Sequence, residues 1–144
     1  MNNPVIQLAR EIGTRKIVAF GSAALSILAS HYPEFLFIGL MPSASEAEET
    51  QKACPQGVFW PYDASSIAPM PVFMGDALCV CELDLYPPVL AQVLVKARSA
   101  GGVVLLSDRP APEVFALAQE HLPGFTFTRA EVPATVLVGR RVRA

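Results

Sequence analysis

Apolar and polar residues alternate along the chain so that strand and helix patterns follow one another. The apolar run Ile17–Phe20 is followed by a helical pattern, and Phe35–Leu40 is apolar on both faces, which is typical of a central parallel strand. Five further runs complete the predicted strands: Val58–Trp60, Ala77–Cys81, Val103–Ser107, Phe125–Ala130 and Thr135–Val142. The last two follow each other closely and predict a closing antiparallel hairpin.

Capping residues indicate where the helices begin. Asn3 precedes Pro4, a combination typical of a helix start, and Ser43 with Glu46 forms a capping-box pattern. The predicted helices cover Pro4–Ile12, Ala23–His31, Ser43 to about Ala53, Val89–Ser99 and Pro112 to about Pro123. Alternation of this kind predicts an α/β fold, with a mostly parallel sheet covered by helices on both faces.

Composition narrows the class of protein. The 144 residues have the length of one domain and no linker divides them, so we expect a single domain over residues 1–144. Hydrophobic residues make up 52% and charged residues 17%. A soluble domain usually has about 25% charged residues. We therefore expect either largely buried strands or a surface that meets a partner.

Charge, cysteines and hydropathy exclude several function classes. The net charge of −2 argues against a nucleic-acid partner. Three cysteines (Cys54, Cys79 and Cys81) suit a reducing compartment better than a disulfide framework, which favours a cytoplasmic location. The start of the chain lacks the apolar core of a signal peptide, and Ile17–Ser30 is too short to span a membrane.

The first strand leads into a turn of the kind that binds nucleotide cofactors. Residues Lys16–Leu28 read KIVAFGSAALSIL, a strand, a glycine and a helix start. Such turns usually carry several glycines, so that a ligand can approach the helix, but Gly21 stands alone here. Two interpretations stay open: a tight turn without a ligand, or a ligand-binding turn.

Four segments of the chain resemble the class I S-adenosylmethionine-dependent methyltransferase family, and together they cover nearly its whole length. They are Ile17–Leu25, Ile38–Glu49, Phe59–Ser65 and Ser99–Asp108, which match the glycine-rich loop, the second strand and helix, the adenine-contacting segment and the fifth strand. The resemblance implies a three-layer α/β/α sandwich with a seven-stranded sheet. Its strand order would be 3-2-1-4-5-7-6, with only the seventh strand antiparallel.

The resemblance also implies which residues would contact the cofactor, S-adenosylmethionine. They are Gly21, Ser22, Met41, Asp63, Ala64 and Glu82. Asp63 corresponds to the aspartate that lies against the adenine. No catalytic residue, metal site or methyl acceptor is indicated.

Several of these positions depart from the family pattern. Ala19 replaces the acid before the loop, Ala23 and Leu25 replace later glycines, and Met41 replaces the acid that holds both ribose hydroxyls. A thioether cannot make those charge-assisted hydrogen bonds. The sequence therefore predicts a methyltransferase-like domain with a degenerate cofactor loop, without catalysis, that binds a ligand or a protein. The alternative is an active methyltransferase with an unusual loop.

Other polar residues offer weaker hypotheses. Four acids follow predicted strands: Asp63, Glu82, Asp84 and Asp108. They could bind a cation or a basic ligand at the sheet edge, or be solvated loop acids and helix caps. Cys79 and Cys81 share one strand face, but two ligands do not complete a zinc site, so we expect core residues. The tail arginines Arg140, Arg141 and Arg143 are expected to form a solvated end.

A long uncharged loop suggests self-association. Residues Ala64–Gly75 read ASSIAPMPVFMG, and exposed apolar patches usually mark interfaces. We expect a homo-oligomer, most simply a two-fold dimer, with this loop or helix Val89–Ser99 in the contact. The alternatives are another protein partner, or a loop that covers a small-molecule pocket at the sheet edge. We expect no nucleic-acid and no membrane partner.

Overall fold

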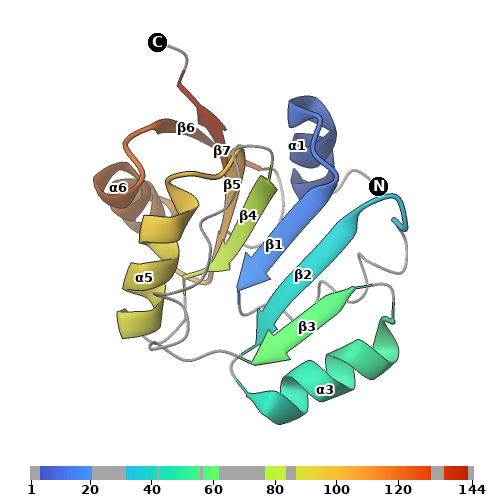
Figure 1. Cartoon of the computed structure of the whole chain (residues 1–144). Coiled ribbons are helices and arrows are strands. Elements are labelled where there is room, and N and C mark those ends of the chain that lie inside the picture. The colour runs from blue at the N-terminus through green and yellow to red at the C-terminus, as the bar shows by residue number, and fades with distance from the viewer. Residues whose placement is uncertain are drawn as a thin grey trace.

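Seven strands form one sheet in the computed structural model of the chain (Figure 1). The structure describes residues 4–20, 32–41, 43–55, 57–61, 77–83, 87–130 and 135–142. The strands are β1 (Lys16–Phe20), β2 (Leu36–Met41), β3 (Val58–Pro61), β4 (Ala77–Glu82), β5 (Gly102–Ser107), β6 (Phe125–Arg129) and β7 (Thr135–Arg141). Their order is β3-β2-β1-β4-β5-β7-β6, and β7 runs antiparallel to both of its neighbours. The predicted fold class and strand order are confirmed.

The described helices are α1 (Pro4–Ile12), α3 (Ala44–Ala53), α5 (Pro87–Ala97) and α6 (Ala111–His121). The Ser43 hydroxyl accepts a hydrogen bond from the Glu46 amide at 3.2 Å, so the predicted cap of α3 is present. Gly13 ends α1 with a φ of 75°. This backbone conformation costs free energy for a residue with a side chain, so glycine is favoured there. The α5 helix starts two residues before the predicted Val89, because a proline suits a first helical turn. The predicted helix 23–31 lies outside the described residues.

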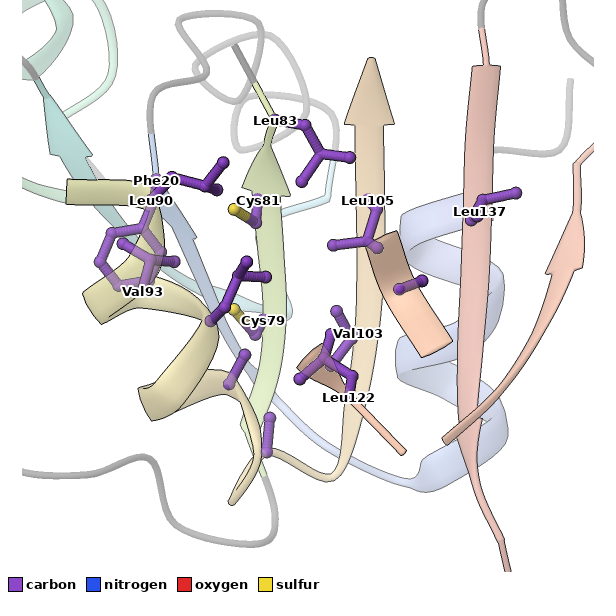
Figure 2. Close-up of a cluster of buried hydrophobic side chains, with 14 of the residues drawn as sticks. Phe20, Cys79, Cys81, Leu83, Leu90, Val93, Val103, Leu105, Leu122 and Leu137 are labelled. Carbon is purple, nitrogen blue, oxygen red and sulfur yellow. The ribbon is translucent and has the colours of Figure 1, made fainter. Parts of the chain in front are cut away.

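Two apolar clusters, one on each face of the sheet, make up the core. On one face, α1 and α3 pack on a cluster that includes Phe37, Met41 and Phe59. On the other face, α5 and α6 pack on a second cluster, part of which is drawn in Figure 2. Figure 2 shows Cys79 and Cys81 of β4 pointing toward α5. The result is the expected three-layer sandwich.

Two glycines in the sheet are covered by aromatic rings from the neighbouring strand. Gly39 pairs with Phe59 in the β2–β3 register, and Gly139 pairs with Phe127 in the β6–β7 register. A Cβ at either glycine would lie 2.5 Å from the paired ring. The missing side chain therefore lets each ring lie directly against the neighbouring backbone.

The polar side chain of Gln51 fixes the connection between α3 and β3. Its amide nitrogen donates to the Gly57 carbonyl at 2.8 Å, and its amide oxygen accepts from the Phe59 main-chain nitrogen at 3.0 Å. This pair of hydrogen bonds sets where β3 begins, and so helps to place the Phe59 ring over Gly39.

Two of the C-terminal arginines are exposed, as expected, but also form specific contacts that the sequence did not indicate. Arg140 forms a bidentate ion pair with Glu11 at the end of α1 and donates to Thr128 at 3.2 Å. This pairing lowers the pKa of Glu11. Arg141 donates to the carbonyls of Arg98 and Ala100, both at 2.8 Å. These contacts tie the end of β7 to α1 and to the segment before β5, while both arginines stay exposed and Arg143 lies outside the described residues.

Replacing Gly39 with alanine should destabilise the fold. The added methyl would meet the Phe59 ring at 2.5 Å and the Met41 methyl at 3.1 Å. Overpacking of this kind costs about 1–3 kcal/mol. Urea unfolding should show that loss in the free energy of unfolding for Gly39→Ala.

The matched control is Gly124→Ala, where an added Cβ meets nothing within 4 Å. It should leave the free energy of unfolding unchanged within about 1 kcal/mol. Equal stability of the two variants would contradict the packing described for Phe59.

Candidate functional site

The strand order reverses at β1, and the candidate site lies at the carboxyl edge beside it. β2 and β4 flank β1 on its two sides, with Leu40 and Cys81 both paired to Phe20. Met41 and Glu82 each follow one residue later, so they border the end of β1. Open α/β sheets bind ligands at such a reversal. The structure thus brings two of the six predicted cofactor residues to the expected place.

The other four predicted cofactor residues, Gly21, Ser22, Asp63 and Ala64, lie outside the described residues. The same holds for Asp84, another of the four acids that could bind a cation. The described part of the site is therefore the strand ends themselves: Phe20, Met41, Pro61, Glu82 and Ser107.

Met41 belongs to the core. Its side chain is 1% exposed and packs in the cluster beneath α1 and α3. A Cβ atom on Gly39 would lie 2.5 Å from the Phe59 ring and 3.1 Å from the methyl carbon of Met41. The thioether is thus part of the tight packing of Gly39 and Phe59, not a side chain that faces a ligand.

Glu82 ends β4 and is half-buried. Its main-chain carbonyl accepts a weak hydrogen bond from the Cys81 thiol at a sulfur–oxygen distance of 3.6 Å. Strand pairing continues beyond it, because the Leu83 amide donates to the Leu106 carbonyl at 2.9 Å. The main chain at Glu82 is therefore fixed by strand pairing, beside the end of β1.

Asp108 lies in a tight turn after β5. The Ser107 hydroxyl accepts a hydrogen bond from the Arg109 amide at 2.9 Å, which turns the chain toward α6. Asp108 is exposed in that turn. No group of three histidine, cysteine, aspartate or glutamate side chains able to hold a metal ion occurs among the residues that the structure describes.

The two strand cysteines are core residues, as their alternation predicts. Both are fully buried beneath α5. Burial raises the pKa of the Cys79 thiol well above its ordinary value. Burial, together with the charge of Glu82, raises the pKa of Cys81 to about 12. Both sulfurs are thus neutral thiols, unsuited to act as nucleophiles or metal ligands.

Gln92 is a polar residue of α5 that the sequence analysis did not single out. Its side-chain oxygen is buried and has no hydrogen-bond partner in the described part of the chain. The only signal for it in the sequence is an amide between Ala91 and Val93 in an otherwise apolar helix segment. An unsatisfied buried acceptor costs about 1–3 kcal/mol, so this oxygen is a polar atom of α5 for which the described residues supply no partner.

The site fits S-adenosylmethionine poorly at the ribose. Two hydroxyls there need a charged acceptor at the end of β2, and the buried Met41 thioether offers none. An acid at this position would be surrounded by the same apolar cluster.

Solved structures show which fold this is. A TehB-like SAM-dependent methyltransferase from Corynebacterium glutamicum matches with a TM-score of 0.65 and 13% sequence identity, over 99% of this chain and 89% of that one. The SAM-bound magnesium protoporphyrin IX methyltransferase of Synechocystis PCC 6803 matches with a TM-score of 0.67 and 15% identity, over 96% and 78% of the two chains. A Geobacter sulfurreducens methyltransferase matches with a TM-score of 0.63 and 16% identity, over 99% and 81%.

These similarities show that the chain has the class I methyltransferase-like fold, as the sequence predicted. At such low identities they show the fold alone. No family model matches the sequence, and neither does any curated protein sequence. In the described part of the chain, no helix has the length and apolar character needed to cross a membrane.

Introducing the missing acid should destabilise the fold instead of creating a site. Met41→Asp would bury a carboxylate in the cluster around Phe59, and we expect a loss of about 3–5 kcal/mol in the free energy of unfolding. The matched control Met41→Leu keeps the volume and should cost less than about 1.5 kcal/mol. Full stability of Met41→Asp in urea unfolding would show that the position faces solvent or a ligand.

The buried thiols should resist modification in the folded protein. All three cysteines are buried, and a pKa of about 12 leaves little Cys81 thiolate at neutral pH. A colourimetric thiol reagent should therefore react only after denaturant is added. Rapid reaction of Cys79 or Cys81 in the native protein, identified by peptide mass, would contradict their assignment as core residues.

Proposed function

We propose that this chain is a methyltransferase-fold domain that does not transfer methyl groups and acts by binding a protein or a small ligand. The observation that carries the proposal is Met41, 1% exposed at the end of β2. In the fold family, that strand end carries the acid that holds the cofactor ribose. Here the position belongs to the core cluster beneath α3.

The energetic consequence is large. A hydrogen bond to a charged group contributes about 1.5–3 kcal/mol. Without the two bonds to the ribose, binding should weaken by about 3–6 kcal/mol, which is about 10²–10⁴-fold. An affinity of about 1 μM would then fall to about 0.1–10 mM from the loss of these two bonds alone.

The described strand ends also supply few groups for chemistry. Asp108 is exposed in its turn, and the two β4 thiols are neutral and buried. Glu82 is the one described carboxylate that is half-buried beside the end of β1. A single carboxylate there suits recognition of a cation or a hydrogen-bond donor on a ligand or protein partner.

The competing function is an active S-adenosylmethionine-dependent methyltransferase with an unusual cofactor loop. Its support is the shared strand order and the sequence position of Asp63, which lies outside the described residues. The two functions differ in whether the cofactor binds at all, so a binding measurement separates them.

Calorimetric titration with S-adenosylmethionine and S-adenosylhomocysteine should show no binding up to millimolar ligand. Thermal unfolding in the presence of either ligand should give no shift in Tm. A folded sample is verified by circular dichroism, so that absence of heat cannot be attributed to unfolded protein.

Binding in the micromolar range would contradict the proposal if it depends on the predicted adenine contact. Asp63→Ala should then abolish it, whereas Asp108→Ala, an exposed aspartate after β5, should not. This pair of variants distinguishes a true cofactor site from weak association with surface carboxylates.

A further inference from the structure

We draw no further inference here: the strongest candidate, the pair of exposed arginines Arg98 and Arg141 where the ends of α5, α6 and β7 meet, donates to the main-chain carbonyls of those helix ends, and nothing among the described residues points to an anionic ligand for it.

Discussion

Burial of the central strands on both faces is the constraint on which this structure depends. Every residue of β4 from Ala77 to Cys81 is buried, and β5 is nearly as enclosed. Such strands are stable only when helices cover both sides, which α1 and α3 do on one face and α5 and α6 on the other. Cys79 and Cys81 of β4 meet this requirement, because small neutral thiols fit in the apolar space where α5 packs on the sheet (Figure 2). Polar chemistry is thereby confined to the strand ends.

At the end of β2, apolar packing includes Met41, a position at the sheet edge where this kind of fold can bind a ligand. Gly39 admits the Phe59 ring, Gln51 anchors the start of β3, and Met41 packs against the same ring. In a cofactor-binding member of this fold, a charged side chain at that strand end faces the ribose. Here a thioether at the corresponding strand end belongs to the apolar core. The proposed role in binding follows from that exchange.

Much of the fold could be predicted because its signals are local. Apolar runs marked all seven strands, and the Ser43 cap appeared as its side-chain pattern required. The replacement at Met41 was also visible in the sequence, but its burial beneath α3 depends on the β2–β3 register, which no local pattern gives. The bonds from Arg141 to the carbonyls at the end of α5 join residues far apart in the chain, so the sequence indicated only a basic tail. The exposure of Trp60 was missed for the same reason, since it depends on how elements distant in the sequence pack around β3.

Methyl NMR of the protein labelled at its methionine methyl groups tests the central claim most directly. The Met41 methyl lies beside the Phe59 ring, so we expect a ring-current-shifted resonance with nuclear Overhauser contacts to that ring. We also expect that resonance to stay unchanged when S-adenosylhomocysteine is added to millimolar concentration. A Met41 resonance that moves in a saturable way on addition of the ligand would place this side chain in a cofactor site and contradict the account. A resonance without contact to Phe59 would contradict the assignment of Met41 to the core.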